Sequence, residues 1–488
     1  MSDRLTGARP RGLKMDADKE QEKRNRDLEK LLGEPKAAIR SMVLAIFLAL
    51  AVVEVNQFVD TYWVSGLGSV SSSAVSTVSP IYGLIMCAGI GVSTGVTAAV
   101  AFHLGRGESE FSSRIAANSL TLGLILAIIS SVLVWIFAEP LLDLMGADDV
   151  IDECMEYLMP FIYLSPLLLC SNIMGGMLRG EGAANKSTVV QASAAILNMI
   201  IDPILIYGLD MGVAGAGYAT CISAGISLVI GLWWYAKGKT VVALTRDSFR
   251  PDKAAMKRSL DVGGPKSVER IISNFTDLIQ RVFLIAAGGT NAVMYYNYAW
   301  RYIALIDLPG RSFENAMVPV CSAGYGQKDL EKMKTGFMYT IKLVVIITVV
   351  LSAFVVVAAE PLMALLTYEE SMAALRDDFV WTLRVSAFLI PFSALMGVGA
   401  SMLQSMNKAK LAMNFYFIWG VAKLIMYAIC AYCFGSYEGI IYSMVIIHVI
   451  GGALLMWMGF REFHRLEKEF EPGGPAAPPE PEPEAEFA

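Results

Sequence analysis

Charged residues are scarce in this chain. They make up 17% of its 488 residues, whereas hydrophobic residues make up 55%, and the mean hydropathy is +0.53. This balance is untypical of a water-soluble globular protein and indicates a polytopic membrane protein. The net charge of −6 says little about partners, because five of the acidic residues lie in the last 18 positions.

The sequence also lacks the residue patterns on which several kinds of chemistry depend. The three histidines, His103, His448 and His464, are far apart and form no metal motif. The seven cysteines lie mostly in apolar runs, which argues against a disulfide framework. No nucleotide-binding loop occurs, so transport powered directly by ATP has no support in this chain. For want of a nucleophile–base pair we expect no enzymatic activity, and we also expect no bound cofactor and no nucleic-acid partner.

Apolar runs of membrane-spanning length recur along the chain. Twelve are expected, near 38–64, 74–104, 115–138, 155–178, 187–207, 213–236, 261–287, 292–320, 335–358, 378–404, 411–433 and 438–460. Loops after the even-numbered spans carry 16 lysines and arginines, whereas loops after the odd-numbered spans carry only Arg376. The positive-inside rule therefore predicts a multi-pass protein of the cell membrane with both termini in the cytoplasm.

The two halves repeat at a nearly constant spacing. An offset of 221 in the numbering places Gly68 on Gly289, and it carries the string Ala-Glu-Pro-Leu at 138–141 onto the same string at 359–362. An offset of 225 then aligns Met177 with Met402. Six spans is an even number, so the repeats have the same orientation and a pseudo-twofold axis along the membrane normal. The predicted fold is an all-α membrane protein with twelve transmembrane helices in two pseudo-twofold-related six-helix bundles.

The expected domain boundaries follow from these runs and from composition. They are a charged cytoplasmic arm at 1–37, an N-terminal bundle at 38–236, a basic cytoplasmic linker at 237–260, a C-terminal bundle at 261–462 and a disordered Pro/Glu-rich tail at 463–488.

A carboxylate inside an apolar run marks the first candidate site. Asn198 and Asp202 are four residues apart in the run 187–207, so on a helix they share one face. An aspartate at the centre of a membrane helix costs ~2.5–3.5 kcal/mol and usually has a function. Pro203 removes a backbone donor and lets the helix bend beside its own acid. The alternative interpretation is that Asp202 and Pro203 only cap a kinked helix.

Two further residues are expected at the same depth. Asp60 in the first span and Thr220 in the sixth lie in the outer half of the first bundle, near Asp202. Oxygen ligands from Asp60, Asn198, Asp202 and Thr220 suit Na⁺, and two close carboxylates could instead share a proton. We therefore predict a cation-coupling site, with Na⁺ or H⁺ as the coupling ion. Alternatively, Thr220 bonds only to its own helix backbone, and Asp60 is an interfacial cap.

The second bundle carries unusual cations within its spans. Possible substrate-contacting residues of the cleft between the bundles are Gln57, Asp277, Arg281, Arg301 and Lys423. Buried charges are normally paired, so internal ion pairs are one interpretation. The other is a cationic wall that holds an anionic head group.

Several strings resemble the MATE (multidrug and toxic compound extrusion) family, and within it the archaeal and DNA-damage-inducible branch. The similar segments are Asp-Thr-Tyr-Trp-Val at 60–64, Asn-Met-Ile-Ile-Asp-Pro at 198–203, Gly-Val-Ala-Gly-Ala-Gly-Tyr-Ala-Thr at 212–220 and Met-Leu-Arg-Gly-Glu-Gly at 177–182. The resemblance implies a twelve-helix antiporter that expels organic cations in exchange for Na⁺ or H⁺. It also implies a coupling site at Asp60, Asn198, Asp202 and Thr220.

The chain also departs from this family. Ser273 and Leu395 stand near the positions where another branch carries coupling acids. The cations of the second bundle are unusual for a site that binds organic cations.

The resulting expectation is a cation-coupled secondary antiporter that exports amphipathic small molecules by alternating access, embedded in the lipid bilayer and functional as a monomer. One alternative is a flippase for a lipid-linked anionic precursor. Another, from a different class, is a membrane receptor or a passive channel.

Overall fold

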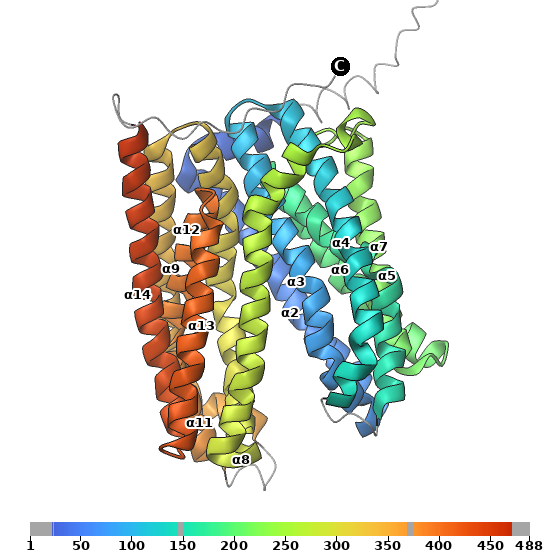
Figure 1. Ribbon diagram of the computed structural model, residues 1–488, viewed down its shortest axis with the longest axis vertical. Helices are drawn as coiled ribbons and strands as arrows, with labels where there is room; N and C mark the ends of the chain where they lie inside the picture. The colour runs from blue at the N-terminus through green and yellow to red at the C-terminus, as the bar shows by residue number, and fades with distance from the viewer. Residues whose placement is uncertain (1–21, 23, 145–149, 368–374, 471–488) are drawn as a thin grey trace, which may run out of the picture.

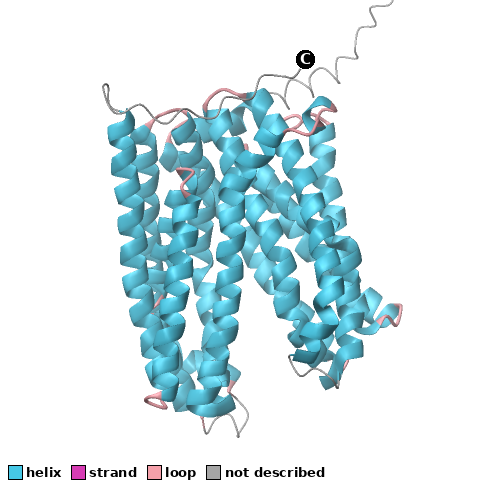
Figure 2. Ribbon diagram, viewed as in Figure 1, coloured by secondary structure: helices cyan, strands magenta, loops and turns pink. Residues whose placement is uncertain are grey.

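The computed structural model describes residues 22, 24–144, 150–367 and 375–470. Over these ranges it is helical, with no β-strand (Figure 2). The helices are α2 (Pro35–Ser65), α3 (Ser69–Gly105), α4 (Ser109–Leu144), α5 (Ile151–Gly180), α6 (Ala184–Pro203), α7 (Gly212–Ala236), α8 (Lys253–Gly326), α9 (Leu330–Leu366), α11 (Arg376–Ala387), α12 (Ile390–Ser405), α13 (Ala409–Tyr432) and α14 (Tyr437–Phe470). A π-helical turn, η2 (Ile204–Gly208), follows α6, and a short 3₁₀ turn, η3 (Asp247–Phe249), precedes α8.

Helix α8 makes two membrane passes. Its 74 residues would extend about 110 Å if straight, far more than the roughly 30 Å hydrocarbon core. Non-helical backbone at Gly288 and Gly289 divides it, and φ of +68° at Gly289 is a conformation that glycine adopts without strain. Eleven described segments meet the length and hydropathy of a membrane span, and the part of α8 after Gly289 is not among them. Residues 290–326 of α8 are nevertheless helical and long enough to cross the bilayer, so we count them as the twelfth span. The predicted fold class, twelve spans in two bundles, is confirmed.

The helices form two bundles (Figure 1), and their starting positions repeat along the chain. Helices α4 and α9 begin at Ser109 and Leu330, which are related by the offset of 221. Helices α6 and α13 begin at Ala184 and Ala409, which are related by the offset of 225. Both offsets are those of the sequence repeat, so equivalent positions in the two bundles can be read directly from residue numbers.

Small residues bring the bundles together on one side of the molecule, here called the linker side because it carries residues 237–252. A Cβ on Gly95 of α3 would lie 2.0 Å from the carbonyl oxygen of Ser259, at the start of α8. On Gly91 it would lie 2.6 Å from the carbonyl oxygen of Gly263. Such close backbone approach needs glycine. Toward the opposite side the bundles diverge (Figure 1).

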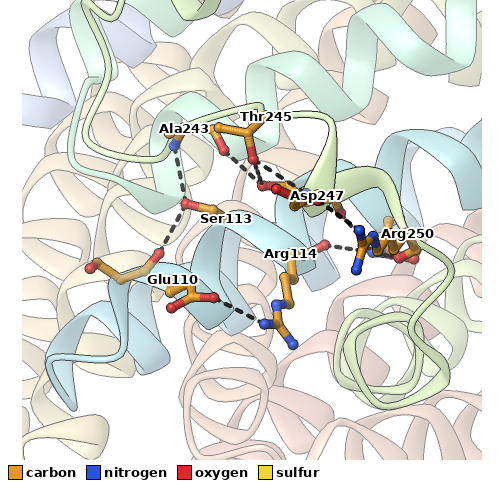
Figure 3. A network of polar contacts seen from close by, with 10 residues as sticks. Glu110, Ser113, Arg114, Ala243, Thr245, Asp247 and Arg250 are labelled. Carbon is orange, nitrogen blue, oxygen red and sulfur yellow. Dashed lines mark hydrogen bonds and ion pairs between the residues drawn. The ribbon is translucent and has the colours of Figure 1, made fainter.

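The linker is fastened to α4 by polar contacts (Figure 3). The Ala243 N–H donates to Ser113 Oγ over 3.1 Å. The Asn118 amide donates to the carbonyl oxygens of Ser248 and Arg250, both over 3.1 Å. The linker therefore ends sooner than the expected boundary at 260. Helix α8 begins at Lys253 because the preceding residue, an aspartate, accepts two N–H groups of the first turn as an N-cap.

The described parts of both chain ends are helical. Residues 24–32, inside the predicted arm, form a helical segment beside both bundles. The Lys332 ammonium donates to the Leu31 carbonyl over 3.0 Å, and Lys186 pairs with Asp27 over 3.3 Å. Helix α14 continues to Phe470, past the expected start of the tail at 463. Residues 1–21 and 471–488, which contain the rest of both predicted terminal segments, lie outside the described ranges.

Candidate functional site

Helices α2 and α6 each present an asparagine and an aspartate four residues apart. The Asn56 amide nitrogen donates to Asp60 Oδ2 over 3.0 Å and to Asn198 Oδ1 over 2.9 Å. The Asn198 amide nitrogen donates to Asp202 Oδ1 over 2.9 Å. The carboxyl groups of Asp60 and Asp202 lie within hydrogen-bonding reach of each other. These four residues, Asn56, Asp60, Asn198 and Asp202, form what we call the polar ring.

The polar ring has more acceptors than donors. Asn56 Oδ1, Asp60 Oδ1 and Asp202 Oδ2 are buried and have no hydrogen-bond partner within the described ranges. Asn198 and Asp202 are 3% and 1% exposed. Buried oxygens without donors are costly, and a proton between the two carboxyl groups or a small hard cation would satisfy them. The described residues hold no cluster of three His, Cys, Asp or Glu side chains able to bind a metal, so a cation here would rely on the two carboxylates and the amide oxygens.

Pro203 ends α6 one residue after Asp202. The chain continues as the π-helical turn η2, which is closed by a hydrogen bond from the Leu209 N–H to the Ile204 carbonyl over 2.9 Å. A proline and a π turn are the usual causes of a local change in helix direction. Within this turn the Tyr207 hydroxyl donates to the Trp63 carbonyl over 2.5 Å. The end of α6 away from the linker side is thus tied to the corresponding end of α2, next to the polar ring.

Thr220 lies on α7, and its hydroxyl donates to the carbonyl of Ala216 in its own helix over 3.0 Å. Within the described ranges Thr220 has no hydrogen bond to the polar ring. This contact is the one expected in the alternative interpretation, in which Thr220 bonds only to its own helix backbone. Only the lone pairs of Thr220 Oγ1 remain available to another group.

A cavity of about 480 Å³ lies between α2 and the second pass of α8. Its polar lining includes Gln57 and Arg301, two of the five residues expected at the cleft. The Arg301 guanidinium lies over the rings of Phe58, at 6.0 Å, and Tyr298, at 5.9 Å. Arg301 has no carboxylate within ion-pair distance among the described residues. This cavity lies toward the side away from the linker, since its lining reaches Ser65, the last residue of α2.

The other three expected cleft residues lie elsewhere. Lys423 of α13 pairs with Asp277 of α8 over 3.8 Å. Arg281, which follows Asp277 by one helical turn, is exposed and has no carboxylate partner in the described ranges. None of these three lines the cavity. Lys423 and Asp277 are thus paired with each other, whereas Arg281 and Arg301 have no carboxylate partner in the described ranges.

Two groups of polar residues were missed by the sequence analysis. Asn56 joins α2 to α6, and its only signal was the same four-residue Asn/Asp spacing as in Asn198 and Asp202. Arg311 of α8 lies 3.8 Å from Glu54 of α2 and 3.8 Å from Asp307, so it links the two bundles by charge. Asp307 and Arg311 are four residues apart on α8, a spacing that the sequence shows, but no spacing connects Arg311 with Glu54.

The sequence of this chain matches a known family and several known proteins. The sequence profile of the MatE family matches residues 45–204 and 265–429. The multidrug export protein MepA of Staphylococcus saprophyticus is 24% identical over 394 residues, covering 80% of this chain and 86% of MepA. MepA of Staphylococcus aureus MRSA252 is 23% identical over 375 residues, covering 77% of this chain and 82% of that protein.

Solved structures of membrane transporters are also similar to this chain. A MOP superfamily transporter from Pyrococcus furiosus, described as having a binding pocket of reverse polarity that suggests a different function, is 27% identical with a TM-score of 0.86; the match covers 90% of this chain and 98% of that one. An outward-facing multidrug resistance MATE family transporter matches with the same identity, TM-score and coverage. Because the matching profile spans well over half of its residues, this chain belongs to the MatE family of membrane transporters.

Proposed function

We propose that the chain is a secondary antiporter that exports amphipathic organic compounds in exchange for Na⁺ or H⁺. The observation that carries this proposal is the polar ring, in which three buried oxygens lack donors. Binding one cation there would satisfy these oxygens at once. The family membership and the export names of the MepA relatives support the export function.

The polar ring spans two helices, which gives the coupling a physical basis. Asn56 and Asp60 lie on α2, whereas Asn198 and Asp202 lie on α6. A cation bound among them reduces the repulsion between the two carboxylates and draws the helices together. A ligand shifts a conformational equilibrium only by binding one state more tightly. The proposed exchange therefore requires different cation affinities in the two states, with α2 and α6 bending at the ring.

The orientation and the assembly are part of the proposal. We place the linker side in the cytoplasm because the basic loops lie on that side. The cavity lined by Gln57 and Arg301 then faces outward. Both bundles come from one chain and enclose the cavity without a second copy, so we propose a functional monomer.

The test uses the purified full chain in sealed vesicles, with a fluorescent organic cation, rhodamine 123, as the exported compound. An imposed Na⁺ gradient and an imposed pH gradient are applied separately, which identifies the coupling ion. We expect Asp202→Asn to keep the fold and abolish gradient-driven export, because the amide preserves the shape and removes the charge. Asp60→Asn should act in the same way.

A matched control lies on the same segment. Asp210 is exposed and outside the polar ring, so Asp210→Asn makes the same chemical change without touching the site. Export by Asp210→Asn should equal that of the unchanged chain. Gradient-driven export by Asp202→Asn at the unchanged rate would refute the coupling role of the polar ring.

A lipid flippase remains the second candidate, and Arg301 favours it. The guanidinium lines the cavity without a carboxylate partner in the described ranges, which suits an anionic head group. Transfer of a fluorescent anionic lipid between vesicle leaflets, lost in Arg301→Gln, would support this function. Retained transfer in that variant would argue against it.

A further inference from the structure

The internal repeat gives the polar ring a counterpart in the second bundle. Helix α2 corresponds to the first pass of α8 at the offset of 221, and α6 corresponds to α13 at the offset of 225. The residues at the positions equivalent to Asn56, Asp60, Asn198 and Asp202 are Asp277, Arg281, Lys423 and Tyr427. We call these four residues the counterpart cluster.

Contacts within the counterpart cluster repeat those of the polar ring. The hydrogen bond between Asn56 and Asn198, of 2.9 Å, is replaced by the ion pair between Asp277 and Lys423, of 3.8 Å. The Lys423 ammonium also lies 5.9 Å from the ring centre of Tyr427. The equivalence found by numbering is therefore also an equivalence of contacts.

Electrostatic interactions also connect residues of the counterpart cluster. The Tyr296 side chain interacts electrostatically with both Asp277 and Arg281. The Tyr427 side chain in turn interacts with Tyr296 and Asp277. Arg281 lies one helical turn after Asp277 on the same face of α8, and Tyr427 lies one turn after Lys423 on α13.

The chemistry of the positions is inverted between the bundles. The Asp60 carboxylate is replaced by the Arg281 guanidinium, and the Asp202 carboxylate by the Tyr427 hydroxyl. At both positions a hydrogen-bond acceptor of the polar ring is replaced by a hydrogen-bond donor in the counterpart cluster, and Lys423 adds an ammonium group. With its aspartates ionised the polar ring carries two negative charges, whereas the counterpart cluster carries two positive charges and one negative charge.

Two groups in the cluster lack a partner. The Tyr427 hydroxyl is buried and has no hydrogen-bond partner within the described residues, and the side chain is 0% exposed. Arg281 has no carboxylate partner there either, since Asp277 pairs with Lys423. An uncompensated cation within a membrane span and a buried unpaired donor are both costly. A negatively charged ligand would satisfy both groups.

We propose that the counterpart cluster binds a monovalent anion between the Arg281 guanidinium, the Lys423 ammonium and the Tyr427 hydroxyl. The anion is either a free halide ion or the carboxylate of an organic compound, since both present one negative charge to the same donors. The two bundles then hold equivalent sites of opposite charge. This site is separate from the polar ring and does not depend on cation coupling.

The test measures ligand binding to the full chain in lipid nanodiscs. Rhodamine 110 carries a free carboxylate, and rhodamine 123 is its methyl ester, so the pair differs at the group of interest. If the carboxylate is the ligand, rhodamine 110 should bind about tenfold more tightly than rhodamine 123, the effect of one charge-assisted interaction, and sodium bromide should compete. If a free halide is the ligand, the two dyes should bind equally and sodium bromide should raise the unfolding temperature.

The sharpest variant is Tyr427→Phe, which removes one hydroxyl. Because that hydroxyl has no partner in the described residues, its loss should leave the unfolding temperature unchanged or higher. It should nevertheless weaken the preference for rhodamine 110 or the stabilisation by bromide, which we call the anion effect. Tyr235→Phe is the matched control, since the Tyr235 hydroxyl is also buried without a partner there but lies on α7. Arg281→Gln, at an exposed position, should remove the anion effect even if Tyr427→Phe folds poorly.

Each result decides the proposal. An anion effect that is lost in Tyr427→Phe and Arg281→Gln and kept in Tyr235→Phe supports it, and the dye and bromide measurements then identify the source of the anion. The absence of both dye preference and bromide stabilisation overturns it, as does an equal response of Tyr427→Phe and Tyr235→Phe. Failure here leaves cation coupling intact, because Asp202→Asn tests that function with the ester dye, which carries no carboxylate.

Discussion

Gly105 and Gly326 make reciprocal contacts across the interface between the two bundles. A Cβ on Gly105 would lie 2.2 Å from the carbonyl oxygen of Ala323, and a Cβ on Gly326 would lie 2.0 Å from the carbonyl oxygen of Phe102. The two glycines are related by the offset of 221, and so are their two partners. The interface is therefore isologous within a single chain, as in a twofold dimer, and closes the linker side by direct contact between backbones.

The first prediction concerns this contact. Gly105→Val should destabilise the closed linker side, because neither neighbour is a flexible side chain that could move away; overpacking of this kind costs about 1–3 kcal/mol. We expect a lower unfolding temperature and slower export, and Gly326→Val should act alike. Gly264→Val is the control, since a Cβ there meets no atom within 4 Å. Equal unfolding temperatures for all three variants would contradict the prediction.

The second prediction concerns Asn56, which joins the two helices of the polar ring. Asn56→Leu removes the donor to Asp60 and to Asn198. The concentration of coupling ion needed for half-maximal export should rise about tenfold, the effect of losing roughly 1.4 kcal/mol. Asn172→Leu serves as the control, because the Asn172 amide donates only to the carbonyl of Leu168 in its own helix. A smaller effect from Asn56→Leu than from Asn172→Leu would remove Asn56 from the site.

The third prediction concerns Thr220. Thr220→Ala should weaken coupling only partly, by no more than about 1 kcal/mol, because the hydroxyl already donates to Ala216 and can offer only a neutral oxygen. Thr220→Ser, which keeps the hydroxyl, should restore the ion dependence measured for the unchanged chain. Complete loss of ion-driven export in Thr220→Ala would show a larger role than this geometry supports.

The fold was largely predictable from the sequence. Spans show as long apolar runs, and the repeat spacing alone identifies the equivalent helices of the two bundles. Boundaries were less accurate where a cap decides them: α8 begins at Lys253 because of the N-cap at Asp252, not where the apolar run begins. Periodicity reports burial and is insensitive to such local hydrogen bonds.

The polar contacts were only partly predictable. Asn198 and Asp202 share one helix face through their spacing, so their contact followed directly from the sequence. The contact of Asn56 with Asn198 joins different helices, and the pairing of Asp277 with Lys423 rather than Arg281 depends on side-chain directions. Such choices arise from tertiary packing and leave no local signal.

The fourth prediction concerns the charge contact between the bundles. Glu54 lies on α2 six residues before Asp60, about 9 Å along the helix axis, so a shift of α2 at the polar ring would move Glu54 relative to Arg311. We expect Glu54→Gln and Arg311→Gln each to slow export, and the double variant to be no slower than either. Such a double-mutant cycle should give a coupling energy of about 0.5–3 kcal/mol, the range for residues in contact.

The control for this cycle is the exposed pair Glu110 and Arg114 on α4. A solvent-exposed pair at this spacing contributes little, so the same changes there should show no measurable coupling in export. Additive effects of Glu54→Gln and Arg311→Gln would mean that the contact between the bundles does not take part in transport.

The last prediction concerns pH and Glu181, which lies between α5 and α6 on the linker side. Burial raises the pKa of Glu181 from its usual 4.5 to about 8, although the Val242 N–H and the nearby Lys186 ammonium act to lower it. Glu181 Oε2 accepts the Val242 N–H over 2.9 Å, while Oε1 is buried without a partner in the described ranges. The folded state therefore prefers the protonated carboxyl group.

A raised pKa in the folded state means that the unfolded chain releases this proton first as pH rises. The contribution of Glu181 to stability should be complete below pH 4.5 and should be lost as pH rises to about 8. Glu181→Gln keeps an acceptor for Val242 and cannot ionise, so its unfolding temperature should fall less over this interval. Glu110→Gln, at an exposed position, should follow the unchanged chain. If Glu181→Gln shows the same loss of stability with rising pH as the unchanged chain, then ionisation of the Glu181 carboxyl group does not cause that loss.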